Sequence, residues 1–297
     1  MTIESIPMNQ KYKGVFYIIV SAFCFALMNM FVRLAGDLPS IQKSFFRNVV
    51  AMVFAAAILF KNRIPFRCRQ GNFWLLALRS AAGTIGILCN FYAVDHLVLA
   101  DASMLNKMSP FFAILFSLWF LKEKISLTQT ACVLGAFLGS LCIIKPTFAN
   151  VDLTAALIGL IGGIGAGAAY TCVRKLGRRG EKSPLIVFFF STFSCLVTLP
   201  WILFDYHPMT FVQLASLLYA GLSAAGGQFA ITAAYTHAPA REISVYDYSQ
   251  VIFSALLGLI VFGQAPDWLS VLGYVVICSM AVLMFLSNTG RLKKTDG

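Results

Sequence analysis

Charged residues are scarce in this sequence: Asp, Glu, Lys and Arg make up only 12% of its 297 residues. A water-soluble domain has about 25% charged and about 45 to 50% apolar residues, whereas 59% of this chain is hydrophobic. A single water-soluble globule is therefore excluded, and we predict a membrane protein. Because one span needs about 20 apolar residues, ten spans would leave little of the chain for a soluble domain.

The sequence also lacks the alternation of apolar and polar residues that marks the strands of membrane β-barrels. Its apolar runs are continuous, as in VFYIIVSAFCFALMNMF from Val15 to Phe31. Since backbone polar groups must be paired inside lipid, continuous runs of this length indicate helices. The predicted fold class is an all-α integral membrane protein with ten transmembrane helices, at about residues 15–34, 44–60, 72–94, 98–120, 127–145, 153–173, 184–204, 211–235, 241–262 and 268–287.

Motifs of enzymes and of ATP-driven pumps are absent as well. The chain has no H-E-x-x-H, no G-x-S-x-G and no Walker A motif, and its eight cysteines include no C-x-x-C pair. The three histidines fall at span ends or in loops, so we predict no metal site and no cofactor. We expect that the protein is not an enzyme. An intramembrane hydrolase or acyltransferase and a scaffold are the less favoured alternatives.

Glycine recurs every four residues at Gly159, Gly163 and Gly167. The stretch GIGAGA from Gly163 to Ala168 also matches a nucleotide-binding fingerprint, but no strand precedes it. We therefore interpret these glycines as a stripe that permits close contact between helices.

Most of the Lys and Arg residues fall on segments that share one side of the membrane with the N-terminus. Short loops rich in these residues stay cytoplasmic, so residues 1–14 and 288–297 are predicted to be cytoplasmic. This bias, together with anionic lipid headgroups, accounts for the net charge of +11. The expected partners are thus membrane lipid and a small-molecule substrate, and not nucleic acid. The chain is expected to be a monomer or a homodimer.

Weak internal repetition divides the chain into two halves. FVRLAG at 31–36 and CVRKLG at 172–177 correspond at an offset of 141 residues, and at an offset of 140 Gly86 meets Gly226 and Ser109 meets Ser249. We predict one repeat at 15–145 and a second at 153–287. Because each holds five spans, an odd number, the second must be inverted in the membrane. Inverted repeats are typical of secondary transporters, whose substrate site lies near the midplane.

The stretch LVLADASMLNKMSPFFAILFSLWFLKEKIS from Leu97 to Ser126 resembles the fourth-helix signature of the EamA-type drug/metabolite transporter superfamily. A start of small residues is followed by Ser109-Pro110 in mid-helix and by a Leu-x-Glu turn from Leu121 to Glu123. The resemblance implies a ten-helix carrier of small organic metabolites in the inner (cytoplasmic) membrane. The second half has Gln250 where the signature would place a proline. The resemblance therefore leaves open whether residues 241–262 bend.

Two charged residues are predicted at the middle of the membrane. Lys107 lies about nine residues into its span, or about 14 Å at 1.5 Å per residue, and Asp247 follows 140 residues later at the corresponding depth. Such residues usually face a cavity or a partner. In one interpretation Lys107 binds a substrate carboxylate or anion, and Asp247 takes an amine or serves as the proton-coupling residue. In the other, the two form a structural salt bridge.

Other polar residues in the apolar spans are candidates for substrate binding or for bonds between helices. The candidates are Asn106, Tyr246, Asn29, Tyr170, Asn90, Gln228 and Arg79, and Ser103, Tyr248 and Ser249 lie on the same two spans as the charged pair. Arg79 and Arg47 could serve as anion anchors, or they could snorkel to the membrane face. Snorkelling is the favoured interpretation for Arg47, near the start of its span.

Pro110 is predicted to kink its span just beyond Lys107, either as a hinge or as a static bend. Glu123 is either a cytoplasmic latch or an ordinary helix end. The function predicted is a secondary active transporter that moves an amino acid or related zwitterion by alternating access. The expected direction of transport is export. The alternative is uptake or exchange of a larger metabolite such as S-adenosylmethionine.

Overall fold

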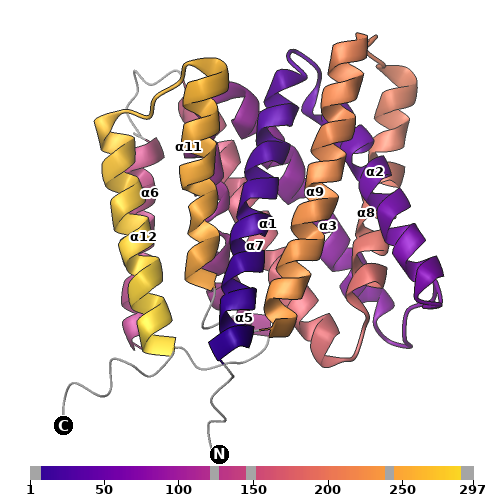
Figure 1. Cartoon of the computed structure of the whole chain (residues 1–297), viewed down its shortest axis with the longest axis horizontal. Coiled ribbons are helices and arrows are strands. Elements are labelled where there is room, and N and C mark those ends of the chain that lie inside the picture. The colour runs from indigo at the N-terminus through magenta and orange to yellow at the C-terminus, as the bar shows by residue number, and fades with distance from the viewer. Residues whose placement is uncertain (1–7, 121–126, 145–151, 238–243, 289–297) are drawn as a thin grey trace, which may run out of the picture.

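A computed structural model describes residues 8–120, 127–144, 152–237 and 244–288. Within these residues every regular element is a helix. They are α1 (Met8–Leu34), α2 (Ser40–Lys61), α3 (Phe73–His96), α4 (Leu99–Asn106), α5 (Ser109–Phe120), α6 (Leu127–Ile144), α7 (Leu153–Arg178), α8 (Ser183–Phe204), α9 (Phe211–His237), the 3₁₀ helix η1 (Ser244–Tyr248), α11 (Ser249–Phe262) and α12 (Trp268–Asn288). The helices lie side by side in one bundle (Figure 1).

Seven of the described helices are long and apolar enough to cross a membrane: Lys13–Leu34, Ser40–Lys61, Phe73–His96, Leu153–Gly177, Ser183–Phe204, Phe211–Ile231 and Trp268–Ser287. The other three predicted spans coincide with shorter pieces, namely α4 with α5, α6, and η1 with α11. Large apolar side chains such as Phe60, Phe204 and Ile260 are exposed on the outside of the bundle. An apolar exterior of this kind suits a lipid environment, where burial of apolar groups is not needed.

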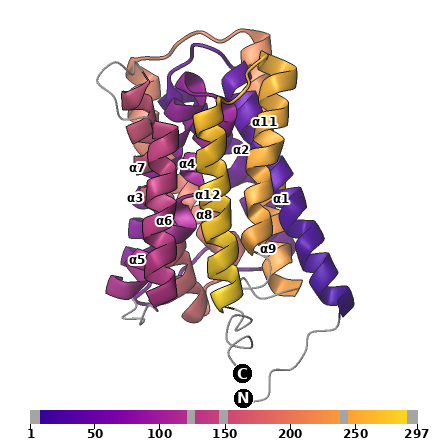
Figure 2. The ribbon, with the colours of Figure 1, turned by 90° about the vertical axis from the view of Figure 1, so that its left-hand side faces the viewer.

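Helices from the two halves of the chain interleave in matched pairs. α1 packs on α9 as α3 packs on α7, and α5 packs on α7 as α11 packs on α1. Two further pairs join equivalent helices, α2 with α8 and α6 with α12; Figure 2 shows α6 beside α12 at one side of the bundle. Each half therefore obtains most of its long-range packing from the other half.

The glycine stripe of α7 lies against α4 and α5. A Cβ atom on Gly163 would lie 2.6 Å from the carbonyl oxygen of Leu105, and one on Gly167 would lie 2.6 Å from Cβ of Phe112. Both distances are far below van der Waals contact, so only glycine fits here. The prediction that these glycines permit close helix contact is confirmed.

The predicted fourth span is interrupted between α4 and α5. Proline has no N–H, and its ring crowds the carbonyl four residues earlier. Pro110 therefore cannot donate the helical hydrogen bond to the carbonyl of Asn106. The Phe111 N–H, which would reach the Lys107 carbonyl in a continuous helix, donates instead to Met108 at 3.0 Å. The freed Lys107 carbonyl accepts a hydrogen bond from the Tyr248 hydroxyl at 3.1 Å. The chain thus breaks where the proline predicted a kink.

The second half changes from a 3₁₀ helix to an α-helix at the corresponding place, although it has no proline there. The 3₁₀ helix η1 ends at Tyr248, and α11 begins at Ser249, which lies 140 residues after Ser109, the first residue of α5. Within the described part of residues 241–262, the chain is a 3₁₀ helix up to Tyr248 and an α-helix from Ser249, so it is not one continuous α-helix.

Polar contacts join helices at both ends of the bundle. At one end, Lys43 of α2 is fully buried and its ammonium lies 2.6 Å from the Asp95 carboxylate of α3. At the other end, Glu181 accepts hydrogen bonds from the Arg69 backbone N–H at 2.7 Å and from the Asn72 side chain at 2.9 Å. Each contact fixes a loop or helix end of one segment against another.

Candidate functional site

Lys107 and Asp247 form an ion pair at the two helix breaks. The Lys107 ammonium lies 2.5 Å from Oδ2 of Asp247, and the two side chains are 8% and 16% exposed. The second carboxylate oxygen, Oδ1, is buried without a hydrogen-bond partner among the described residues. Lys107 follows directly after α4, and Asp247 lies in η1. The pairing predicted from their equivalent positions is present, and one acceptor atom of the pair remains available.

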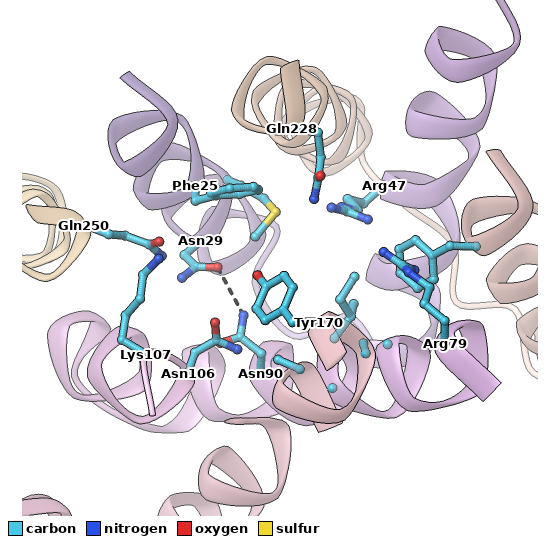
Figure 3. Close-up of a pocket in the computed structure, with 17 residues that line it drawn as sticks. Phe25, Asn29, Arg47, Arg79, Asn90, Asn106, Lys107, Tyr170, Gln228 and Gln250 are labelled. Atoms are coloured by element: carbon cyan, nitrogen blue, oxygen red, sulfur yellow. Dashed lines mark hydrogen bonds between the residues drawn. The ribbon is translucent and has the colours of Figure 1, made fainter. Parts of the chain in front are cut away.

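A polar pocket lies beside this pair, between helices of both halves (Figure 3). Seven of the nine predicted substrate-binding residues line it: Lys107, Asn106, Asn29, Tyr170, Asn90, Gln228 and Arg79. Residues that the sequence did not single out as binding candidates also line it, including Phe25, Met28, Phe190 and Gln250. Asp247 is not a lining residue, but it holds the Lys107 ammonium.

A chain of hydrogen bonds crosses four helices at the pocket wall. Asn90 of α3 donates to Asn29 of α1 at 3.2 Å, and Asn29 donates to the Ser103 hydroxyl of α4 at 3.3 Å. Ser103 in turn shares a hydrogen bond of 2.7 Å with Ser254 of α11. The asparagines therefore bond between helices and line the pocket at the same time, so the two interpretations of these residues do not exclude each other.

Arg47 corrects one expectation. It does not snorkel to the membrane face: it is 3% exposed and lines the pocket. The reason is that α2 begins at Ser40, earlier than the predicted span, so Arg47 lies about 10 Å along the helix from its start. Its Nη1 atom donates to Asn48 at 2.7 Å. Asn48 is itself bonded to Ser194 of α8 at 2.9 Å.

Arg79 of α3 also reaches the pocket from the interior. It is 8% exposed, and its guanidinium carbon lies 3.9 Å from the centre of the Phe190 ring. This is a cation–π arrangement, which suits the planar guanidinium group. Figure 3 shows the Arg79 and Arg47 guanidinium groups near each other at one end of the pocket and Lys107 with Gln250 at the other, with Tyr170 between them.

Tyr246 corrects a second expectation. It is 40% exposed and does not line the pocket, whereas Tyr248, 8% exposed, bonds to the Lys107 carbonyl. A 3₁₀ helix has three residues per turn instead of 3.6. The side chains of η1 therefore point in different directions around the helix axis than those of the predicted α-helix would. Gln250 also lines the pocket. Its position as a polar residue in an apolar run was the signal that could have identified it.

Two further predicted residues concern movement. Pro110 belongs to the first turn of α5, next to the break, and its role as a hinge stays a prediction. Glu123 lies outside the described residues.

A bundle of apolar helices around a central polar pocket, with interrupted helices and an ion pair beside it, defines the class of polytopic membrane transport proteins. The chain belongs to the EamA-like transporter family, whose model matches it twice, at residues 12–145 and 153–286. The protein is therefore a multi-pass membrane transporter of the drug/metabolite transporter superfamily, as the fourth-span signature indicated.

Two curated relatives and one solved structure illustrate the range of similarity. The pseudopaline exporter CntI of Pseudomonas aeruginosa is 32% identical over 279 residues, which cover 93% of this chain and 97% of the relative. Human solute carrier family 35 member G1 is 28% identical over 295 residues, covering 93% of this chain and 78% of the relative. A crystal structure of a protein with 15% identity superposes with a TM-score of 0.66 over 93% of this chain and 98% of its own. At that identity the superposition supports the fold alone.

Proposed function

We propose that the protein is a secondary active transporter that exports an amino acid or related zwitterion across the cytoplasmic membrane by alternating access. The observation that carries this proposal is the polar pocket beside the Lys107–Asp247 pair, where helices of both halves are interrupted. Polar groups in an apolar bundle are costly unless they are paired or face a wet cavity. Seven of the predicted polar residues converge on one such cavity.

Alternating access requires helices to rearrange around a fixed site. We infer that the protein consists of two inverted five-helix repeats, residues 15–145 and 153–287, with ten spans in total and the site between them. The matched packing of α1 on α9 and α3 on α7 supports the repeat symmetry, because equivalent helices make equivalent contacts. So do the two helix breaks, because the residues of the ion pair beside them are 140 positions apart. The proline-dependent break at Pro110 is the proposed hinge, and Glu123 remains the proposed cytoplasmic latch.

Asp247 is the proposed proton-coupling residue, because its carboxylate can take either a substrate amine or a proton. Without substrate, the ionised Asp247 holds Lys107 at 2.5 Å. A zwitterion would bind with its carboxylate at Lys107 and its amine at the ionised Asp247. Protonation of Asp247 would cancel the charge that holds the amine and would release the substrate. Proton and substrate would therefore exclude each other at one carboxylate, which couples proton entry to substrate exit.

Two further observations support the proposed direction and placement of transport. The first turn of α1 and the last turn of α12 lie at the same end of the bundle (Figures 1 and 2), and the charge distribution favours the cytoplasm for that end. A relative that is 32% identical is named an exporter, which supports export.

The family is named for transporters, and the relatives are named an exporter and a solute carrier. These names favour a transporter over an enzyme.

The test is counterflow in proteoliposomes. Vesicles containing purified protein are loaded with one unlabelled amino acid from a panel of acidic, neutral and basic ones, and uptake of the same labelled amino acid is measured. We expect at least one to accumulate above protein-free vesicles, accumulation to be lost in Lys107→Ala, and accumulation to be retained in Lys61→Ala, whose side chain is exposed at the end of α2. Equal accumulation in Lys107→Ala and wild type, or none with any amino acid, would contradict the proposal.

A further inference from the structure

The pocket contains more positive charge than its described residues balance. Three cations line it, Arg47, Arg79 and Lys107. The Asp247 carboxylate pairs with Lys107, and among the described residues no carboxylate lies within ion-pair distance of either arginine. A guanidinium group stays charged at physiological pH, and an unpaired buried charge is strongly disfavoured in an apolar interior. The two arginines thus leave two positive charges that an anion could neutralise.

Donor groups of both arginines are also unused. Nε of Arg47 and both Nε and Nη1 of Arg79 are buried without a hydrogen-bond partner among the described residues. Buried polar groups are nearly always bonded in folded proteins. Donors that lack a partner at the wall of a cavity therefore indicate a ligand or water that fills it. An oxyanion with two oxygens matches the planar fork of a guanidinium group.

Both guanidinium groups are held in place before any ligand binds. Arg47 donates to Asn48, which is hydrogen-bonded to Ser194 of α8, and the Arg79 guanidinium lies over the ring of Phe190 of α8. Side chains fixed by neighbours lose little freedom on binding, which favours a dedicated binding site. In Figure 3 they face the same end of the pocket, separated from Lys107 by Tyr170. The site therefore has two ends, one with the arginines and one with the Lys107–Asp247 pair.

We propose that Arg47 and Arg79 form an oxyanion-binding subsite, so that the ligand of this pocket carries an acidic group in addition to any carboxylate bound by Lys107. The inference rests on the proposed function in taking the pocket as the substrate site. It narrows the substrate from a neutral zwitterion to an acidic one. A carboxylate and a phosphate monoester share the required chemistry: negative charge and several acceptor oxygens.

The experiment measures thermal stabilisation of the purified, detergent-solubilised protein by two matched probe pairs. L-Glutamate is compared with L-glutamine, which replaces the side-chain carboxylate by an amide, and glycerol 3-phosphate is compared with glycerol. The variants are Arg47→Gln and Arg79→Gln, with Arg67→Gln as the control because Arg67 is exposed in the loop between α2 and α3. Arg47→Lys and Arg79→Lys keep the charge and are used if a glutamine variant does not fold.

We expect at least one acidic probe, and neither neutral counterpart, to raise the melting temperature of the wild type. The probe that acts identifies the anion as carboxylate or phosphate. In each glutamine variant the concentration for half the shift should rise about tenfold or more, as for loss of a charge-assisted hydrogen bond. A lysine variant should give a smaller increase, and Arg67→Gln should respond like wild type.

A wild type that responds to no acidic probe, or to the neutral counterparts equally, would overturn the proposal. So would an unchanged response in the arginine variants. The counterflow assay is separate from this binding assay. If neutral amino acids are transported but no acidic probe binds, only the proposal of an arginine subsite is contradicted. If an acidic probe binds but no amino acid is transported, only the transport proposal is contradicted.

Discussion

Asp247 is the residue on which proton coupling depends. Asn carries no ionisable proton, so Asp247→Asn should remove the dependence of efflux on a proton gradient, whatever its absolute rate. The measurement is the efflux rate from proteoliposomes with and without a proton gradient. Asp205→Asn is the control, since the Asp205 side chain is 55% exposed between α8 and α9. A dependence on the gradient in Asp247→Asn that matches wild type would exclude Asp247 as the coupling residue.

Tyr248 stabilises the helix break through its hydrogen bond to the Lys107 carbonyl. We expect Tyr248→Phe to lower stability by about 1 kcal/mol, the usual net value of a buried hydrogen bond and within the range measured between membrane helices. Tyr246→Phe is the matched control on the same 3₁₀ helix, because Tyr246 is 40% exposed whereas Tyr248 is 8% exposed. Thermal unfolding in detergent compares the two. Equal melting temperatures would show that the freed carbonyl needs no partner.

Individual residues show what could be predicted from sequence. Charge and depth identified Lys107 and Asp247, because a lysine and an aspartate are conspicuous in apolar spans and stand at equivalent positions. Arg47 was misplaced because its predicted span began later than α2 does, so its depth was underestimated. Tyr246 was misplaced because apolar periodicity does not distinguish a 3₁₀ turn from an α-helical one.

At the scale of helices, the contact of α7 with α4 depends on Gly163. Gly163→Ala would place a methyl group 2.6 Å from the Leu105 carbonyl oxygen, so the helices must separate. Overpacking of this kind costs about 1 to 3 kcal/mol, which should appear as a lower melting temperature and weaker counterflow. Gly177→Ala in the same helix has nothing within 4 Å of the added methyl. It should be neutral or slightly stabilising, and equal effects of both substitutions would contradict the packing argument.

Continuous helices were easier to predict than interrupted ones. Seven of the ten predicted spans correspond to single long helices, since one apolar run of about 20 residues is sufficient evidence for a span. The break before α5 was predictable because proline removes a defined hydrogen bond. The break before α11 was not, since Gln250 carries no such signal. There η1 contacts other segments through the Lys107–Asp247 ion pair and the hydrogen bond from Tyr248 to the Lys107 carbonyl, which a sequence pattern does not reveal.

At the scale of the molecule, the charge distribution gives a topology that can be tested. We expect a green fluorescent protein fused to either end of the chain to fluoresce and alkaline phosphatase fused to either end to be inactive, since both termini are assigned to the cytoplasm. A phosphatase fusion after residue 207, in the segment between α8 and α9, should be active. An active phosphatase at one terminus only would contradict an even number of spans.

Alternating access means that one pocket opens in turn to each side of the membrane. Asn106 lines that pocket, so Asn106→Cys in a chain without its eight native cysteines provides a chemical probe. A membrane-impermeant thiol reagent is added to right-side-out and to inside-out vesicles, with and without a transported amino acid. We expect modification from both faces and slower modification when substrate is present. Modification from one face only, under all conditions, would contradict alternating access.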